Sequence, residues 1–214
     1  LRAEVGVGVA LLALAAARLL SPARRRPRPA RAEELEAVAR LAAASPRASA
    51  HLALLGDKDF LLSESGRSFL MYAGEGRSLV AMGDPVGPQE EQAELVWRFR
   101  ELADAAGGWP VFYQTCRETL PLYVDLGLAI LKIGEQASVP LPEFSLEGKA
   151  RKGFRNVRNR LRTEGWEFAV LPPAEVRARM DELAAISAAW LADKRTREKG
   201  FSLGRFAPDY LARF

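Results

Sequence analysis

The amino-acid sequence predicts a mixed α/β fold, and three observations carry that prediction. At 214 residues and 49% hydrophobic content, the chain is long and apolar enough to bury a core. Short runs rich in Phe, Leu, Val and Met, each the size of a strand, are separated by glycine-containing turns. Longer stretches with apolar residues at helical spacing lie before and after these runs. Strands and helices are therefore expected to alternate along the chain.

Up to residue 139 the expected order is helix, three strands, helix, strand, helix, strand. The ranges of these elements are 31–45, 59–63, 68–73, 78–84, 89–108, 109–115, 118–127 and 128–139. The first helix carries Leu35, Val38 and either Leu41 or Ala42 on one face. The three strands are joined by the turns ESG and GEG, which predict an antiparallel meander. The helix at 89–108 begins with acidic residues and ends at Gly-Gly.

A similar pattern partly restarts after the proline-containing linker PLPEF. Its expected elements are a basic helix, a strand, a long helix and a loop, at 147–164, 166–172, 173–193 and 194–206. The final stretch, APDYLARF, has the composition of a helix start. The layout predicts two α/β units in tandem, 32–144 and 145–214, of which the second is incomplete.

A meander, a Gly-Pro turn, a helix and then strand–helix–strand is also the element order of GNAT-like acyltransferases. In that fold the turn after the long strand offers backbone N–H groups and a helix N-terminus to a phosphate. The stretch GDPVGPQEEQ occupies this place, but Asp84, Glu90 and Glu91 bring negative charge to it. The acids argue against anion binding, and Asp84 is expected to be either a turn or cap residue or a substrate ligand.

The first 31 residues combine an apolar run with a basic flank. Residues 5–17 are apolar without interruption, and the run as far as residue 20 reaches roughly 24 Å as a helix, slightly less than a bilayer core. Five arginines follow at 24–31, whereas a signal peptide would carry its positive charge before the run. We expect the end of a transmembrane helix at 1–20 and a basic juxtamembrane linker at 21–31. The arginines predict a cytoplasmic body and a linker that can touch an anionic membrane surface.

Basic residues are concentrated in two segments, 24–31 and 149–162. Together they hold 12 of the 31 basic residues, which leaves 19 basic and 27 acidic residues elsewhere, a net charge of −8. The protein is therefore an acidic body with two basic patches.

The basic helix carries two adjacent stripes. Arginines recur on one side at i, i+4, i+7 and i+11, namely Arg151, Arg155, Arg158 and Arg162. Phe154, Val157 and Leu161 form an apolar stripe that is expected to pack the helix on its domain. A solvated face would mix charges of both signs, and a membrane-surface helix would show a wider apolar arc. A nucleic-acid backbone is the favoured partner, and anionic lipid or a solvated face remains open.

Cysteine and histidine are too scarce for several classes of site. Cys116 is the only cysteine, so no internal disulfide can form, and no Cys/His cluster offers a zinc site. It stands beside an apolar run and is expected to be a buried, inert thiol. His51, the only histidine, is expected to be structural, which argues against histidine-based hydrolysis. We expect neither a metal nor a cofactor.

Five blocks of sequence together resemble one known family. They are HLALLGDKDFLLSESGRSFLMYAGEGRSLVAMGDPVGP, ELVWRFRELADAAGGWPVFYQ, LPLYVDLGLAILKIGEQASVPL, FSLEGKARKGFRN and EKGFSLGRF. Over about residues 45–214 the chain is similar to the cytoplasmic domain of the phosphatidylglycerol lysyltransferases (aminoacyl-phosphatidylglycerol synthases). These bifunctional, multi-pass proteins of the cell membrane make aminoacyl-phosphatidylglycerol and flip it.

The resemblance implies tandem GNAT-like units after a bundle of membrane helices. It also implies that aminoacyl-tRNA, most simply lysyl-tRNA, is the donor and that phosphatidylglycerol is the acceptor. Modifying the lipid charge in this way would give resistance to cationic antimicrobial peptides. Two other functions remain open: a Fem-like transferase that uses the same donor on a peptidoglycan precursor, and a GNAT-like binding module without activity.

The implied reaction exchanges one ester for another, because a lipid glycerol hydroxyl attacks the ester that joins the amino acid to tRNA. It needs a base and donors for the oxyanion, but neither ATP nor a metal. Glu198 and Lys199 are the expected catalytic residues, with Glu198 as base or orienter. The expected substrate-binding residues are Lys194, Arg197 and Ser202 in the same loop, the four arginines of the basic helix, and Asp84. The alternative for the loop is to cap the long helix and tie the two units together.

Overall fold

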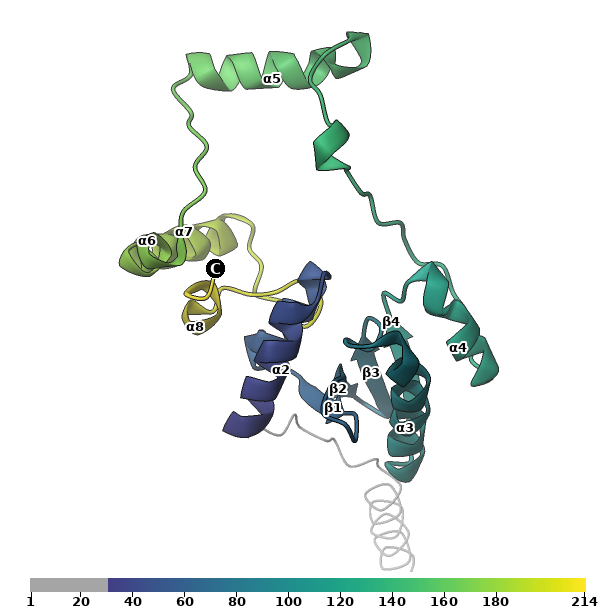
Figure 1. Cartoon of the computed structure of the whole chain (residues 1–214). Coiled ribbons are helices and arrows are strands. Elements are labelled where there is room, and N and C mark those ends of the chain that lie inside the picture. Colours follow the sequence, from purple (N-terminus) through teal and green to yellow (C-terminus); the bar gives the residue numbers. More distant parts are fainter. Residues whose placement is uncertain (1–30) are drawn as a thin grey trace, which may run out of the picture.

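The structure, a computed structural model, describes residues 31–214 (Figure 1). Within that range four strands form one mixed sheet in the order β1-β2-β3-β4. The strands are β1 (Asp59–Leu62), β2 (Phe69–Glu75), β3 (Ser78–Met82) and β4 (Trp109–Tyr113). The α-helices are α2 (Ala32–Ala44), α3 (Gln92–Ala105), α4 (Leu120–Asp125), α5 (Lys152–Thr163), α6 (Pro173–Ala178), α7 (Met180–Asp193) and α8 (Pro208–Leu211). The 3-10 helices are η1 (Ala48–Leu55), η2 (Gln89–Glu91), η3 (Arg117–Thr119), η4 (Leu141–Glu143) and η5 (Lys149–Arg151).

Helices cover both faces of the sheet. Consecutive residues of β2 point to opposite faces, so alternate side chains pack against different helices. Phe69 and Met71 pack against α2 and η1, while Leu70 and Tyr72 pack against α3. The buried partners in the helices are Val38, Ala42, Ala50 and Ala53 on the first face, and Phe99 and Ala103 on the second. Burial of each large side chain stabilises the fold by about 1.5–3 kcal/mol. The mixed α/β fold expected from the sequence is confirmed.

The expected antiparallel meander is confirmed as well. β2 and β3 are joined by a two-residue turn between the paired residues Glu75 and Ser78, in which Gly76 has φ 58°. β4 pairs in parallel with β3, with Ala81 opposite Phe112, after a crossover through α3. The carboxyl ends of β3 and β4 therefore meet at one edge of the sheet, where open α/β sheets place their ligands.

Two of the expected strands do not form. Residues 128–139 and 166–172 run as irregular chain with no strand pairing among the described residues, so this part of the prediction is wrong. An apolar run becomes a strand only beside a hydrogen-bonded neighbour, and here Leu131 is 80% exposed and Phe168 92% exposed. Residues 128–172 form an arch that carries α5 at its top, away from the sheet (Figure 1). The second tandem unit stays a prediction.

Helix boundaries also depart from the expected ones. The long helix expected at 173–193 is two helices, α6 and α7, because Arg179 leaves helical geometry with φ −108° and ψ 14°. The basic helix begins at Lys152, after the 3-10 turn η5. Among the helices described by the structure, none combines the length and apolar character needed to cross a bilayer. The expected membrane helix at 1–20 lies outside the described residues.

Glu91 is a buried acid that joins the start of α3 to the turn between β1 and β2. Its two carboxylate oxygens accept hydrogen bonds from the hydroxyls of Ser65 (2.7 Å) and Ser68 (2.5 Å), and Arg67 forms an ion pair with it at 2.6 Å. The backbone of Gly87 passes so close that a Cβ there would lie 2.3 Å from Ser68 Oγ. Hydrogen bonds from Ser68 and Ser65 lower the pKa of Glu91 from 4.5 to about 2.

This pKa shift predicts an acid-dependent loss of stability. A carboxylate whose pKa is lowered on folding favours the folded state above pH 4.5, and that contribution disappears as the pH falls toward 2. We expect Glu91→Gln to lower the urea midpoint of unfolding at neutral pH and to unfold with a weaker pH dependence than the wild type. The exposed acid Glu64 in the same turn provides the control Glu64→Gln. Urea titrations at several pH values test this, and equal pH dependence in all three proteins would contradict it.

Candidate functional site

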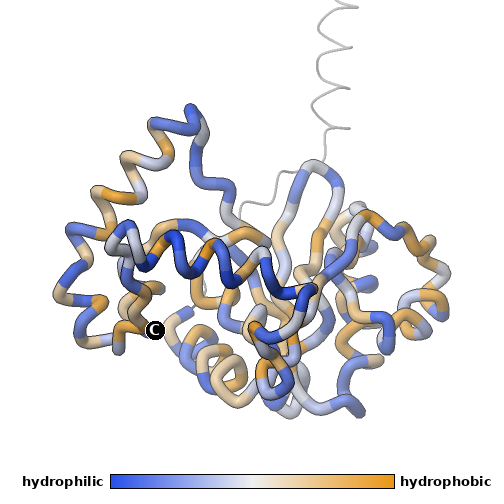
Figure 2. Tube along the Cα trace, turned by 90° about the horizontal axis from the view of Figure 1, so that it is seen from above, coloured by the Kyte–Doolittle hydropathy of each residue, from blue (hydrophilic) through white to orange (hydrophobic). Residues whose placement is uncertain are grey.

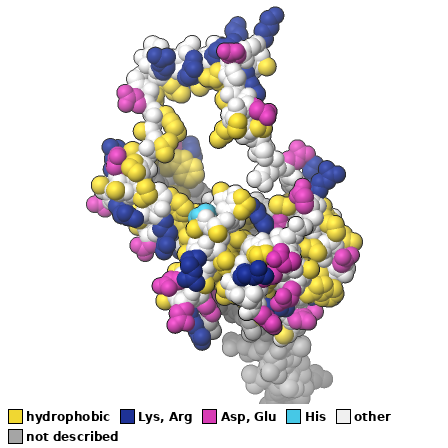
Figure 3. Space-filling model, viewed as in Figure 1, with side chains coloured by type: hydrophobic (Ala, Val, Ile, Leu, Met, Phe, Trp, Pro, Cys, Tyr) yellow, Lys and Arg dark blue, Asp and Glu magenta, His cyan; other side chains and the backbone are white. Residues whose placement is uncertain are grey.

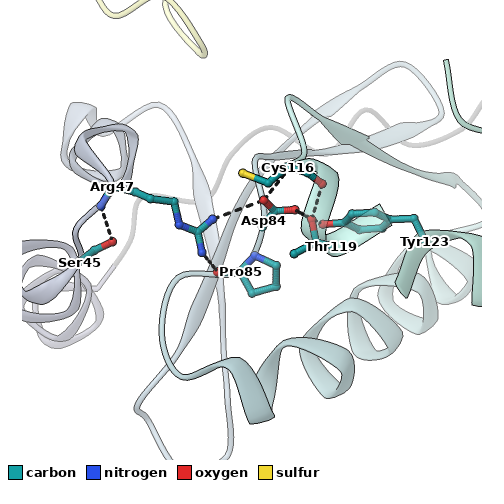
Figure 4. Close-up of polar contacts among 7 residues, drawn as sticks. All are labelled: Ser45, Arg47, Asp84, Pro85, Cys116, Thr119 and Tyr123. Carbon is teal, nitrogen blue, oxygen red and sulfur yellow. Dashed lines mark hydrogen bonds and ion pairs between the residues drawn. The ribbon is translucent and has the colours of Figure 1, made fainter. Parts of the chain in front are cut away.

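Asp84 lies just beyond β3 at the carboxyl edge of the sheet, and its side chain is almost completely buried. Its Oδ1 accepts hydrogen bonds from Thr119 Oγ1 at 2.5 Å and from the Tyr123 hydroxyl at 2.7 Å. Its Oδ2 accepts one from the Cys116 backbone N–H at 3.0 Å and lies 3.4 Å from Arg47 Nη1 (Figure 4). Both oxygens are therefore saturated with donors that come from separate elements of the fold.

Local backbone geometry fixes this arrangement. Gly83, in a left-handed conformation with φ 72°, donates its N–H to the Tyr113 carbonyl and turns the chain out of the sheet. Arg47 also donates to the Pro85 carbonyl at 2.9 Å, so its guanidinium holds both sides of the turn. Burial, together with the Asp84 carboxylate, raises the pKa of the Tyr123 hydroxyl far above its usual range. Tyr123 thus acts as a neutral donor.

Sequence reasoning singled out Asp84 but missed Arg47, Thr119 and Tyr123. These partners lie 37, 35 and 39 positions away, and no local motif connects them with Asp84. The arrangement supports the turn or cap role that the sequence left open. A direct contact between Asp84 and a substrate would require one of its present donors to be replaced.

Cys116 is exposed, so the expectation of a buried thiol is wrong. The apolar run of β4 ends at Tyr113, and Cys116 falls in the turn before η3. Partial desolvation and the nearby Asp84 carboxylate raise the pKa of its thiol. The thiol is protonated at neutral pH and poorly suited to act as a nucleophile.

The four arginines of the predicted stripe divide into two pairs, of which the first, Arg151 at the end of η5 and Arg155 on α5, stabilises the turn leading into the helix. The guanidinium of Arg151 lies 5.3 Å from the ring centre of Phe144 and 5.8 Å from that of Phe154. Arg155 donates hydrogen bonds to two backbone carbonyls of the preceding turn, including that of Gly148 at 2.7 Å. These two arginines therefore have an intramolecular role.

The side chains of the second pair, Arg158 and Arg162, are exposed, and neither guanidinium forms a hydrogen bond or ion pair with another residue in 31–214. Arg162 lines an open polar hollow with Asn159 and Thr163. Figure 3 shows the Lys and Arg side chains gathered over α5, at the opposite end of the molecule from the sheet. Free positive charge on α5 is thus carried by this pair and by Lys152, which is also exposed.

The apolar stripe of α5 does not pack on the sheet domain as expected. Phe154 is 55% exposed and Val157 48% exposed, and the ring of Phe154 meets that of Phe144 in the same arch. In Figure 2 the helix is largely hydrophilic, broken by short hydrophobic stretches. The expectation is wrong for the described residues because the arch holds α5 away from both helical layers.

The loop at 194–206 is closed by one of its own predicted site residues. Glu198 Oε1 accepts the Phe206 N–H at 3.2 Å and lies 3.5 Å from Ser187 Oγ on α7. Lys194 pairs with the adjacent Asp193 at 3.0 Å. Of the remaining predicted residues, Arg197 and Lys199 are exposed and Ser202 is half-buried.

The predicted site residues therefore lie in three groups: Asp84 at the sheet edge, the arginines of η5 and α5, and the loop at 194–206. No hydrogen bond or ion pair within 31–214 joins the loop to α5. Nor does this range contain three His, Cys, Asp or Glu side chains placed to hold a metal ion. The three groups are separate within residues 31–214, and the roles predicted for their members stay proposals.

Comparison with known proteins places this geometry in context. Residues 39–214 match the family model described as phosphatidylglycerol lysyltransferase, C-terminal. The phosphatidylglycerol lysyltransferase of Bacillus subtilis (strain 168) is 42% identical over 164 residues, 77% of this chain and 19% of that protein. The protein of the same name from Staphylococcus aureus (strain MSSA476) is 36% identical over 163 residues, 76% of this chain and 19% of that protein. The chain thus spans about a fifth of the length of these relatives.

Two solved structures share the fold. One, described as the C-terminal domain (DUF2156) of a lysylphosphatidylglycerol synthetase from Agrobacterium fabrum, has a TM-score of 0.82 and 41% sequence identity. The alignment covers 85% of this chain and 58% of that one. The other, L-PGS from Bacillus licheniformis, has a TM-score of 0.77 and 38% identity, with 88% of this chain and 59% of that one covered. From the family model and these relatives together, the chain belongs to the phosphatidylglycerol lysyltransferase C-terminal family.

Proposed function

We propose that this chain is part of an enzyme that transfers an aminoacyl group, lysyl in the first instance, from aminoacyl-tRNA to phosphatidylglycerol. The observation that carries the proposal is family membership over residues 39–214, together with relatives that bear the name phosphatidylglycerol lysyltransferase. The free arginine pair on α5 supports a polyanionic donor, because guanidinium groups pair well with phosphate oxygens. Lipid lysylation would reduce the negative charge of the membrane surface and oppose the binding of cationic antimicrobial peptides.

The proposed chemistry divides the work among the three groups of residues. Arg158 and Arg162 bind the tRNA backbone without reading its sequence, since no base-reading element accompanies them. Glu198 takes, or orients, the proton of the glycerol hydroxyl, and Lys199 stabilises the negative charge that develops on the ester oxygen. Lys194, Arg197 and Ser202 contact the phosphate or the hydroxyls of the lipid headgroup. Asp84 supports the sheet edge beside which the lipid headgroup would bind.

The location proposed for the protein follows from the same reaction. Its acceptor is embedded in a bilayer, and the apolar run with its arginine flank at 1–31 favours a membrane-bound protein with this domain on the cytoplasmic side. Aminoacyl-tRNA is found in that compartment, so donor and acceptor would meet at the inner membrane surface.

The proposal predicts a specific product from the full-length protein. Incubated with lysyl-tRNA and phosphatidylglycerol vesicles, it should form lysyl-phosphatidylglycerol, detected by separating the lipids and identifying the new species by mass. Other charged tRNAs in parallel reactions establish the amino acid, and a peptidoglycan precursor in place of the vesicles tests the Fem-like alternative. Absence of any aminoacylated lipid with every charged tRNA would refute the proposal and leave the binding-module alternative.

The free arginine pair of α5 yields a second prediction. Replacing Arg158 and Arg162 by Gln should weaken tRNA binding whatever the tRNA sequence, and should flatten the salt dependence by about one unit of slope at most per lost phosphate contact. Replacing Arg40 and Arg177, which are exposed arginines outside α5, by Gln is the control with the same loss of charge. Binding is measured at several salt concentrations, alongside sedimentation with anionic vesicles.

Three results of this comparison are informative. Selective loss of tRNA affinity in the α5 variant supports the proposal. Loss of vesicle binding with an unchanged tRNA salt slope would instead assign α5 to anionic lipid. Equal behaviour of the α5 variant and its control would make α5 a solvated surface. Arg155 is unsuitable for this test, because its removal would also release the turn before the helix.

A third prediction concerns inhibitors. Activity of the full-length protein should survive EDTA, because residues 31–214 offer no cluster of metal-binding side chains and ester exchange requires no metal. Cys116→Ser should retain wild-type activity, since a thiol with a raised pKa is a weak nucleophile at neutral pH. Transfer assays with EDTA and with this variant check both points. Strong inhibition by EDTA, or inactivity of a folded Cys116→Ser protein, would contradict the prediction.

A further inference from the structure

The loop at 194–206, which carries five of the proposed site residues, is attached to the sheet domain through Asp57. The carboxylate Oδ2 of Asp57 accepts a hydrogen bond from the Phe201 N–H at 2.8 Å, although the two residues are 144 positions apart. Its other oxygen, Oδ1, accepts one from Lys58 Nζ at 2.6 Å. Asp57 lies two residues before β1, so the attachment point belongs to the sheet domain.

Lys58 holds the Asp57 carboxylate in place. Its side chain is fully buried, and its Nζ also donates to the Leu52 carbonyl at 3.1 Å. Burial lowers the pKa of Lys58, against the opposing effect of Asp57. A buried ammonium is strongly unfavourable unless it is paired and hydrogen-bonded, so the Lys58 charge keeps Asp57 in this orientation. The same Nζ lies 5.5 Å from the centre of the Phe201 ring.

The hydrogen bond from the Phe201 N–H to Asp57 helps to maintain an unfavourable backbone conformation in the loop at 194–206. Phe201 has φ 51°, a left-handed conformation that is unfavourable for a non-glycine residue. Gly200 before it has φ 64°, and a Cβ there would lie 3.1 Å from Asp57 Oδ2. Nearby, Arg205 donates to the Leu55 carbonyl at 3.0 Å, which provides a second attachment at the end of η1. A backbone of this kind persists only where its surroundings fix it.

We propose that Asp57, oriented by Lys58, is a positioning residue for the transfer reaction: it fixes the loop at 194–206 so that Glu198 is held in one place relative to the substrates. This inference rests on the proposed function, because the role of Glu198 does. Glu198 lies three positions before Phe201 and is itself bonded to the far end of the loop at Phe206. Anchoring at Phe201 and closure by Glu198 therefore define a single rigid segment. Loss of the anchor displaces the base without touching the arginines of α5.

The first experiment measures the anchor itself. Asp57→Asn keeps an oxygen acceptor, and the double variant Asp57→Ala/Lys58→Met removes the anchor without leaving a buried charge behind. Hydrogen exchange of the Phe201 amide should be about 10- to 100-fold faster in the double variant and intermediate in Asp57→Asn. Amides of β2 and β3 should exchange as in the wild type, which shows that the sheet is folded. Glu64→Gln is the control. Unchanged exchange at Phe201 in a folded double variant would overturn the inference.

The second experiment measures the consequence for the reaction in the full-length enzyme. With lysyl-tRNA and phosphatidylglycerol vesicles, kcat should fall about tenfold or more in the double variant and less in Asp57→Asn. KM for lysyl-tRNA should stay within about twofold of the wild type, because affinity for tRNA is assigned to α5. A general loss of stability would lower the amount of folded enzyme, which is measured separately at each pH, whereas misplacement also alters the pH profile of kcat per folded enzyme through the displaced base.

The two levels of the proposal fail in different ways. If the wild-type enzyme makes no aminoacylated lipid, the proposed function is wrong. If the wild type is active and the double variant matches Glu64→Gln in kcat and pH profile, only the positioning role is wrong. A folded double variant with reduced kcat, an altered pH profile and unchanged KM establishes the role.

Discussion

The carboxylate of Asp84 connects the two layers of helices through the edge of the sheet. Arg47 reaches it from the segment between α2 and η1, on one face, while Thr119 and Tyr123 reach it from the start of α4, beside α3 on the other. A buried carboxylate is tolerated only when its oxygens are fully hydrogen-bonded, and here each oxygen has two donors. The parallel pairing of β3 with β4 makes this possible, because it brings Gly83 and Cys116 to the same edge.

Charged side chains have different roles in the sheet domain and in the arch that carries α5. The sheet domain uses its buried charges internally, as the environments of Asp84, Glu91 and Lys58 show. Exposed positive charge is instead concentrated on η5 and α5, where two of the four arginines of the stripe contact the turn that precedes α5. A helix that uses part of its basic stripe for its own support can present the rest at a fixed angle. A polyanion would thus meet two free arginines on one helix rather than four independent side chains.

The sequence was informative where a structural signal is local. Short apolar runs separated by glycine turns located β1, β2 and β3, and helical periodicity located α2, α3 and α5. The segments at 128–139 and 166–172 were misassigned because their strand-like composition says nothing about whether a neighbouring strand is there to pair with. The partners of Asp84 and Asp57 could not be found from the sequence, since a hydrogen bond between distant residues leaves no spacing to recognise. The burial of Cys116 was predicted wrongly, because the apolar run before it ends at Tyr113, three residues earlier.

The contact between Asp57 and Phe201 also has a consequence for the order of folding. The meander pairs residues that are close in sequence, such as Glu75 and Ser78, so little chain entropy is lost before its contacts form. The anchor joins residues 144 positions apart and can form only after the arch and the helices that follow it have been synthesised. On a ribosome the sheet domain would therefore be complete while the loop is still absent. The loop at 194–206 is therefore ordered only after the strands of the sheet domain have been made.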